Sequence, residues 1–248
     1  MNYKHLGTAC ATGALLAASL STMTLARAAG EEVTEVQSPH SFSANVAMTT
    51  NYMFRGVSQT GNQGAIQGGF DYSYTPFDIN LGIWGSNVAS DGFGGASMET
   101  DFLASWTPSW DKLGLDLGYV RYQYFQTDYN PNNTNEFHLG LSYDLTYFTP
   151  SFTANYSDNW FGDGDSWYYD LSVDIPLPYD FTLSGHYGWN QFTGDLGFNN
   201  YEDYSVGISR EFHGFGFDLS WVDRTKQDDC VSPFDCGSTA VFTVSKSF

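Results

Sequence analysis

Residues 136–147 read Glu-Phe-His-Leu-Gly-Leu-Ser-Tyr-Asp-Leu-Thr-Tyr, and this stretch decides the fold class. Large apolar side chains alternate with polar ones from Phe137 to Tyr147, with Gly140 as the one small interruption. A period of two places the two kinds of side chain on opposite faces of a β-strand. The run is also longer than most strands of globular proteins and is sufficient to cross a bilayer at a tilt. The stretch therefore predicts a membrane-spanning strand.

The same alternation occurs in twelve segments of the chain. An even number of strands of about ten residues is typical of bacterial outer-membrane barrels. The expected strands are residues 42–54, 64–75, 77–88, 97–107, 113–126, 135–148, 151–158, 166–175, 180–190, 201–212, 215–224 and 239–248.

The connections between these segments alternate in length. Joints such as Thr75-Pro76, Thr149-Pro150, Pro176 to Tyr179 and His213-Gly214 are tight, whereas stretches such as 89–96 and 225–238 are long and polar. Short periplasmic turns and longer extracellular loops are the outer-membrane arrangement. We therefore predict an all-β transmembrane antiparallel barrel of about twelve strands, with both termini in the periplasm. A soluble β-sandwich is the alternative, but it would need shorter strands with their apolar faces inward.

The first residues resemble a secretory signal peptide. A weakly basic start at Lys4 precedes an uncharged stretch of small and apolar residues, and Ala26-Arg27-Ala28 offers a cleavage site. We expect residues 1–28 to be removed, residues 29–41 to form a short periplasmic segment, and residues 42–248 to form one barrel domain. After residue 28 no apolar run is long enough to span a bilayer as a helix.

The chain is strongly acidic. Removing residues 1–28 takes away Lys4 and Arg27 and no acid, so 7 basic residues face 28 acidic ones, a formal charge of −21. Such a surface repels nucleic acid. The sequence suggests no cofactor.

Two cysteines, Cys230 and Cys236, follow residue 28. An even number of cysteines in a chain expected to be exported favours a disulfide over a metal site. No histidine or further cysteine lies beside them at zinc-ligand spacing. We therefore expect a disulfide and no metal.

The chain ends in Phe242-Thr243-Val244-Ser245-Lys246-Ser247-Phe248. Alternating Phe242 and Val244 with a terminal Phe248 resembles the signal that the outer-membrane barrel-assembly machinery reads. Lys246 departs from an apolar face, but at the membrane rim its ammonium can reach the headgroups.

Three stretches are similar to the TorF-type porin family of Gram-negative outer-membrane proteins, formerly uncharacterised. They are Asn51-Tyr52-Met53-Phe54-Arg55-Gly56-Val57-Ser58-Gln59, Gly82-Ile83-Trp84-Gly85-Ser86-Asn87-Val88, and Val241 to Phe248. The resemblance runs over nearly the whole chain after residue 28. It implies porin character but no catalytic residues or known substrate.

If the apolar positions face lipid, the opposite positions line the lumen or its rims. A lumen lined by carboxylates concentrates cations. Arg121 breaks this pattern, because it shares a face with Leu117, so the strand either contains a bulge or places Arg121 at the upper rim. The candidate lumen residues are Asp71, Asp78, Glu99, Asp101, Asp116, Glu136, His138, Asp144, Asp170, Asp174, His186, Asp203, Glu211 and Asp218.

These features predict a porin-type channel for passive diffusion of small solutes, preferring cations, in contact with outer-membrane lipid and lipopolysaccharide. Twelve tilted strands enclose a backbone cylinder of roughly 12 Å radius, which inward side chains narrow severely. One alternative is a rim-located hydrolase, but no histidine lies in a nucleophile motif such as G-x-S-x-G, so we predict no enzyme. Another is an adhesive or structural barrel that meets a partner through Trp160-Phe161.

Overall fold

The computed structural model describes residues 38–125, 133–194 and 199–248. The expected signal peptide and most of the segment 29–41 lie outside these ranges. Twelve long antiparallel strands form a closed barrel, as predicted. They are β1 (His40–Thr49), β4 (Ala65–Tyr74), β5 (Ile79–Asn87), β6 (Met98–Trp106), β8 (Leu113–Tyr124), β9 (Thr134–Tyr143), β10 (Thr149–Ser157), β11 (Ser166–Leu177), β12 (Phe181–Phe192), β13 (Tyr201–Phe212), β14 (Phe215–Arg224) and β15 (Thr239–Ser247).

The remaining elements are small. Three two-residue strands, β2 (Met53–Phe54), β3 (Val57–Ser58) and β7 (Ser109–Trp110), accompany the barrel. No helix in the described ranges is long and apolar enough to cross a membrane. Single 3₁₀ turns occur at η1 (Thr75–Phe77), η2 (Ser90–Gly92), η4 (Trp160–Gly162), η5 (Pro178–Asp180) and η6 (Gln227–Asp229).

The first and last long strands close the barrel. Each of the twelve pairs with its neighbours in the chain, and β1 pairs with β15 in the register Ala47↔Ser245. The seam begins with a pair of backbone hydrogen bonds, in which Ala44 N–H donates to Phe248 O at 3.2 Å and Phe248 N–H donates to Ala44 O at 2.9 Å. Closure pairs the described barrel strands with a neighbour on each side, except at strand ends such as His40–Ser43, which pair with β4 alone.

Apolar side chains face outward, which is the opposite of a soluble sandwich. Met48 is 64% exposed and Ile66 63%, whereas their neighbours Ala47 and Gln67 are 5% and 6% exposed. The barrel therefore presents an apolar belt to its surroundings and turns its polar side chains inward. Other outward-facing members of the belt are Phe42, Leu81, Phe102, Leu117, Leu139, Phe152, Leu171, Tyr187, Ile208 and Leu219.

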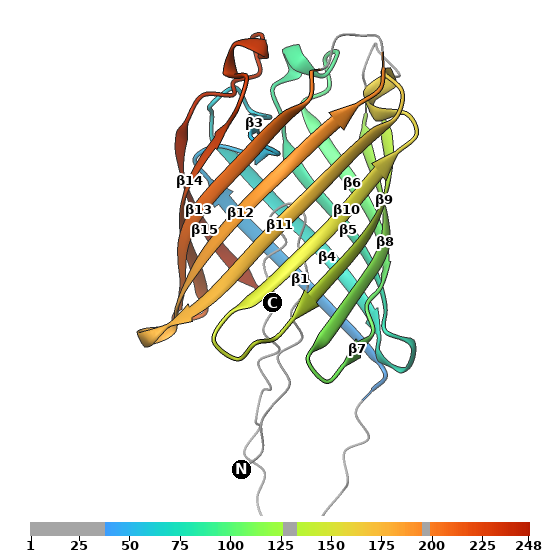
Figure 1. Ribbon diagram of the computed structural model, residues 1–248, viewed down its shortest axis with the longest axis vertical. Coiled ribbons are helices and arrows are strands. Elements are labelled where there is room, and N and C mark those ends of the chain that lie inside the picture. The colour runs from blue at the N-terminus through green and yellow to red at the C-terminus, as the bar shows by residue number, and fades with distance from the viewer. Residues whose placement is uncertain (1–37, 126–132, 195–198) are drawn as a thin grey trace, which may run out of the picture.

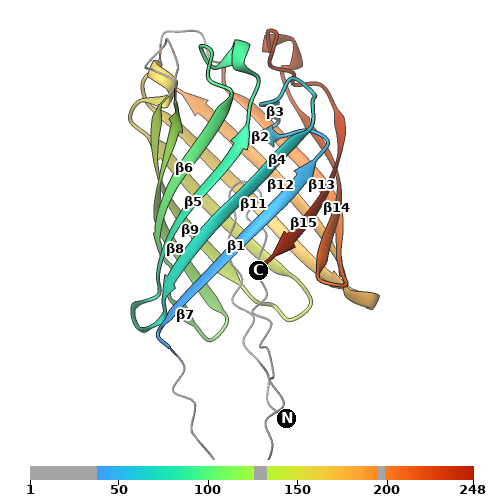
Figure 2. The same cartoon turned by 180° about the vertical axis from the view of Figure 1, so that it is seen from behind.

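Figures 1 and 2 show tilted strands with tight connections at the end where β1 begins, and longer connections at the opposite end. We call these the turn end and the loop end. The turn end includes η1, η5 and the His213-Gly214 turn, in which Gly214 has a φ of 72°. The alternation of short and long connections agrees with the sequence prediction.

Two strand ends were predicted wrongly. The first strand was expected to reach Phe54, but β1 ends at Thr49 and residues 50–64 leave the wall. The stretch 135–148 was expected to be one strand, but β9 ends at Tyr143 and residues 144–148 form a turn. There the Asp144 side chain accepts the Thr146 N–H at 2.6 Å, and Thr146 has a φ of 75°. Apolar residues continue through this turn, so the alternation does not mark where the strand stops.

The secondary structure predicted for two prolines was also wrong. Pro150 and Pro176 were expected in turns, but they belong to the first residues of β10 and the last residues of β11. A missing N–H interrupts little of the hydrogen-bond ladder at such terminal positions.

Arg121 lies on the outward face of β8. The pairing of β8 is continuous on both sides, with Phe102↔Arg121 and Arg121↔Asn135, so the strand contains no bulge. The guanidinium donates to Asn135 Oδ1 at 2.9 Å, near the loop end of β9. Of the two explanations offered by the sequence, the rim position is therefore correct.

The register of the seam can be tested by cross-linking. Ala47 and Ser245 form a non-hydrogen-bonded pair, the kind in which facing side chains come closest. We expect Ala47→Cys with Ser245→Cys to form a disulfide under mild oxidation, detectable as a linked peptide by mass spectrometry. The control pair, Ala47→Cys with Thr243→Cys, lies on the same face two residues out of register and should link poorly. Equal linking of both pairs would contradict the register.

Candidate functional site in the barrel lumen

Residues 50–64, called here the inward loop, leave the wall after β1 and fold into the lumen. Their tip is the β2–β3 hairpin, in which Arg55 and Gly56 have φ values of 48° and 72°. Two successive residues with positive φ form the tight turn that suits hairpins. Gly56 is required for a second reason, since an added Cβ would lie 2.9 Å from the Cβ of Asp203 on the lumen wall.

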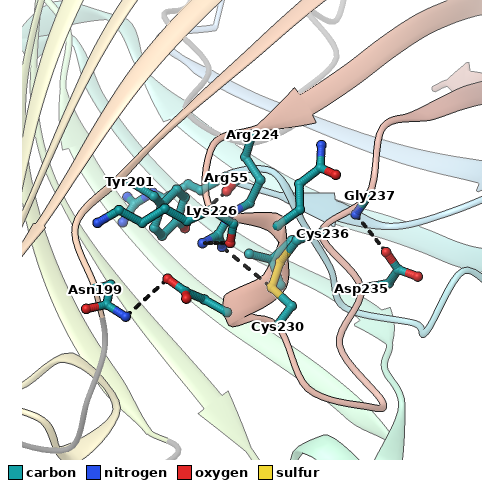
Figure 3. The surroundings of a disulfide bond; sticks show 12 residues. Arg55, Asn199, Tyr201, Arg224, Lys226, Cys230, Asp235, Cys236 and Gly237 are labelled. Carbon is teal, nitrogen blue, oxygen red and sulfur yellow. Dashed lines mark hydrogen bonds between the residues drawn. A yellow bond between two sulfur atoms is a disulfide. The ribbon is translucent and has the colours of Figure 1, made fainter.

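The disulfide-closed loop 230–236 holds the outer part of the inward loop. Cys230 and Cys236 are joined, as predicted, with their Cα atoms 5.9 Å apart. Within that loop the backbone oxygen of Asp235 accepts the Ser58 N–H at 2.7 Å, and its carboxylate accepts the Asn62 side chain at 2.8 Å. Figure 3 shows Arg224 beside the disulfide, with its Nη1 3.6 Å from the Cys230 sulfur.

Arg55 crosses the lumen. Its Nη2 lies 2.7 and 2.8 Å from the two carboxylate oxygens of Glu136 on β9, and its Cζ lies 4.0 Å from the ring centre of Tyr168 on β11. Strands β9 and β11 flank β10, which stands six strands from β1 in either direction round the ring. The loop that starts at β1 therefore reaches the opposite wall and divides the lumen.

The Arg55 guanidinium stays charged in this position. Burial alone disfavours the charged form, but the Glu136 carboxylate more than compensates and raises the pKa of Arg55 above that of a free arginine. The rings of Phe54 and Trp160 also lie 4.9 and 4.8 Å from Arg55 Cζ, within the range of cation–π attraction.

Further carboxylates gather beside the inward loop on β6. Glu99 and Asp101 are 2% and 6% exposed. The Tyr52 hydroxyl donates to Glu99 at 3.3 Å. Burial raises the pKa of Tyr52, with the Glu99 charge adding to the effect, so the phenol keeps the proton it donates.

An apolar cluster forms inside the loop end of the barrel, above these carboxylates. The rings of Phe93 and Tyr124 stack at 4.6 Å, and Phe234 meets Phe93 edge-on at 5.3 Å. Trp160 belongs to this cluster and is 6% exposed. The idea that Trp160 projects outward toward a partner is therefore wrong.

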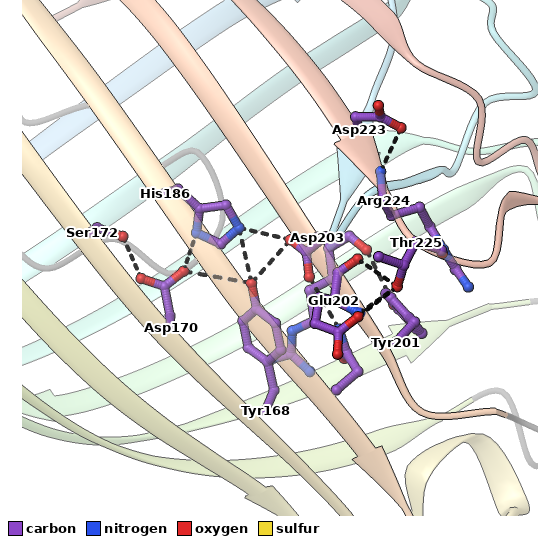
Figure 4. A network of polar contacts seen from close by, with 12 residues as sticks. Tyr168, Asp170, Ser172, His186, Tyr201, Glu202, Asp203, Asp223, Arg224 and Thr225 are labelled. Carbon is purple, nitrogen blue, oxygen red and sulfur yellow. Dashed lines mark hydrogen bonds and ion pairs between the residues drawn. The ribbon is translucent and has the colours of Figure 1, made fainter.

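A third group of polar side chains centres on His186 of β12, as Figure 4 shows. Its Nε2 lies 2.7 Å from Asp203 Oδ1, and its Nδ1 is paired with Asp170. The Tyr168 hydroxyl donates to Asp203 at 3.2 Å, and the Asn190 amide donates to the other oxygen of Asp203 at 3.1 Å. Tyr168 thus links this group to Arg55, which lies against its ring.

The carboxylates facing the lumen form two tiers along the strands. The upper tier, in the loop-end half, consists of Glu99, Asp101, Glu136, Asp170 and Asp203. The lower tier, nearer the turn end, consists of Asp71, Asp116, Asp174 and Asp218.

The lower tier is sparsely paired. Asp116 is bonded to His138 at 3.0 Å. In the described ranges, no basic side chain lies within ion-pair distance of Asp71, Asp174 or Asp218.

The remaining predicted lumen residues lie toward the turn end. Asp78 and Asp144 occupy turns and are exposed, so they belong to the rim and not to the wall. Glu211 is near the turn end of β13. The structure thus brings the upper-tier acids together around one loop and leaves the others dispersed.

Sequence reasoning missed the partners of Arg55. The stretch 42–54 looks like one continuous strand, although Arg55-Gly56 after it is a two-residue turn signal that could have been recognised. Nothing in the local pattern of Trp160 or Tyr168 distinguishes them from the other aromatic residues.

Two known structures with a similar fold are porins. The structure of the "KdgM porin" matches with a TM-score of 0.57 and 8% identity, covering 83% of this chain and 98% of that one. A "NanC porin" structure matches with a TM-score of 0.56 and 9% identity, covering 82% and 97%. The fold is therefore that of porin-type barrels.

A family model described as "Bacterial protein of unknown function (Gcw_chp)" matches residues 33–248, and the chain belongs to this family. No curated protein matches the sequence significantly.

The pairing of Arg55 with Glu136 can be measured by a double-mutant cycle. Glu136→Gln leaves a buried guanidinium unpaired, and we expect it to lower the free energy of unfolding by about 3–5 kcal/mol. Arg55→Met should cost a similar amount, and the double variant less than the sum. The measurement is urea unfolding in lipid vesicles. Arg210→Met, an outward-facing arginine stacked on Phe181, is the control and should change little. Additive energies would show that the two residues are not coupled.

Proposed function

We propose that the protein is a porin-type channel of a Gram-negative outer membrane, which lets small solutes cross by passive diffusion and prefers cations. The observation that carries the preference is the imbalance of charge inside the barrel. Of the seven lysines and arginines that follow residue 28, only Arg55 and Arg224 point into the lumen. Arg121, Arg210 and Lys246 lie on the outward face, and Lys112 and Lys226 lie in exposed connections.

The solute path would run from the loop end past the inward loop to the turn end. Arg55 crosses the lumen beside the upper tier, so we place the constriction of the path at this level. The unpaired acids of the lower tier would then attract cations along the rest of the path, because a low-dielectric wall focuses their field.

The outer surface of the barrel supports the proposed location in a membrane. The outward belt consists of large apolar side chains over the whole circumference, and the similarity to TorF-type porins points the same way. Lys246 fits a position at the turn-end rim, since its Nζ donates to the Gly214 oxygen at 2.8 Å. Phe242, Val244 and Phe248 remain candidates for the assembly signal, with lipid, lipopolysaccharide and the assembly machinery as expected partners.

The structure gives little support to the two alternative functions, a rim-located hydrolase and an adhesive barrel. His138 and His186 pair with aspartates, and in the described ranges neither ring hydrogen bonds a serine or threonine hydroxyl. A hydrolase would need such a pair to activate its nucleophile. The adhesive alternative depended on Trp160-Phe161, of which Trp160 is buried and Phe161 is half-buried.

Membrane insertion predicts a penalty that depends on depth. Leu139 lies at the middle of β9 and Leu113 at the turn end of β8, and both are exposed on the outer face. We expect Leu139→Arg to reduce the free energy of folding into vesicles by about 2–4 kcal/mol and Leu113→Arg by about 0–1. Fractionation of cells should place the unmodified protein in the outer membrane. Equal and small effects of Leu139→Arg and Leu113→Arg, together with recovery of the unmodified protein in the soluble periplasmic fraction, would contradict the outer-membrane location.

Cation preference can be tested by reversal potentials in planar bilayers under a salt gradient. The wild-type protein should favour K⁺ over Cl⁻ strongly at low salt and weakly at molar salt, because screening shortens the reach of each charge. Asp71→Asn, Asp174→Asn and Asp218→Asn together should reduce the K⁺/Cl⁻ permeability ratio several-fold. The outward-facing control Glu202→Gln should leave that ratio unchanged. Anion preference of the wild-type protein at neutral pH and low salt would overturn the assignment.

A further inference from the structure

We propose that the pocket holding Arg55 is a binding site for solutes that carry a guanidinium group, and that Arg55 occupies it as an internal substitute for such a solute. We call this pocket the guanidinium cage and define its walls as Tyr122, Glu136, Trp160 and Tyr168. The proposal rests on the proposed channel function only where it concerns solute passage, because binding itself is independent of conduction.

The cage belongs to the barrel and not to the inward loop. Glu136 comes from β9, Tyr168 from β11 and Trp160 from η4 in the connection between β10 and β11. That connection is tied to β9, since the Thr134 hydroxyl accepts the Phe161 N–H at 2.7 Å and donates to Asn159 O at 3.0 Å. The connection that carries Trp160 is therefore tied to β9 by contacts that do not involve the inward loop, and Phe54 of that loop packs against Tyr122 and Trp160 in addition.

The chemistry of the cage suits a guanidinium group. The Trp160 and Tyr168 rings lie 4.8 and 4.0 Å from Arg55 Cζ, and the Glu136 carboxylate lies at the edge of the group. A planar, weakly hydrated cation can stack on aromatic rings and bond a carboxylate at the same time, whereas a compact ammonium holds its water more strongly. The Tyr122 hydroxyl, 3.2 Å from Glu136 Oε1, helps to orient the acceptor.

Arg55 fills the cage incompletely. Both of its short contacts with Glu136 come from Nη2, while Nη1 is buried and has no hydrogen-bond partner among the described residues. Guanidinium and carboxylate groups can instead form two parallel hydrogen bonds from two nitrogens. A free solute, which is not constrained by the hairpin backbone, can adopt that geometry.

An empty cage would be unfavourable. Glu136 is 2% exposed, and Arg55 is its only ion-pair partner in the described ranges. A buried carboxylate without a counter-charge is strongly destabilising. Withdrawal of the inward loop therefore favours the entry of another cation, and a guanidinium solute that takes the cage releases the loop from the opposite wall.

The test uses Arg55→Ala, which removes the internal occupant, with ethylguanidinium chloride as the probe. Binding is measured by isothermal titration calorimetry on the full-length protein in detergent micelles, at millimolar probe. We expect Arg55→Ala to bind ethylguanidinium at least tenfold more tightly than the wild-type protein, in which tethered Arg55 competes. Ethylammonium and the neutral ethylurea should bind Arg55→Ala at least tenfold more weakly than ethylguanidinium.

The matched control is Arg55→Ala with Glu136→Gln, which should lose most of the affinity for ethylguanidinium. Heat-modifiable migration on gels establishes that each variant is folded, and Arg55→Met, which preserves more of the side-chain volume, replaces Arg55→Ala if the latter does not fold. Equal binding of ethylguanidinium by Arg55→Ala, wild type and the Glu136→Gln double variant would overturn the proposal.

Conductance in planar bilayers separates this proposal from the proposed function. Arg55→Ala should conduct more than the wild-type protein, and ethylguanidinium should lower its conductance. Binding without conductance in any variant would refute the channel and leave the cage, whereas conductance without selective binding would refute the cage and leave the channel.

Discussion

The rest of the structure depends on closure of the backbone hydrogen-bond ladder between β1 and β15. Backbone N–H and C=O groups in an apolar medium must be paired within the protein, and a ring of antiparallel strands pairs them all. Closure also fixes the two faces, because side chains alternate along every strand. Once the outer face is apolar, the polar side chains of the same strands have no place except the interior.

Because the polar side chains face inward, the acidic composition of the chain brings many carboxylates into the lumen. Like charges brought together inside a low-dielectric wall repel one another and are costly to bury. The upper tier meets this cost with tyrosine hydroxyls, with His186 between Asp170 and Asp203, and with Arg55 against Glu136. The inward loop brings Arg55 to Glu136, where the described strands place no other basic side chain within ion-pair distance. The segment that crosses the lumen therefore also supplies the positive charge that pairs with Glu136.

The number of strands, their approximate positions, the outward apolar face and the alternation of turns and loops follow from local pattern, because a period of two is a property of neighbouring residues. The residues at which strands end are harder to predict from this alternation. Apolar positions continue past Tyr143 into a turn and past Thr49 into the inward loop, so alternation alone gives no stopping point. The pairing of Cys230 with Cys236 was accessible because they are the only two cysteines that follow residue 28.

The sequence by itself determined the barrel and which side chains face inward, since both depend on the order of polar and apolar residues along each strand. Only the tertiary structure decided that Arg55 meets Glu136, 81 residues further along the chain, and the rings of Trp160 and Tyr168. That contact requires the ring to place β9 and β11 opposite β1 and the loop to turn inward. No local pattern encodes the distance across a lumen, because it arises only when all the strands have closed around it.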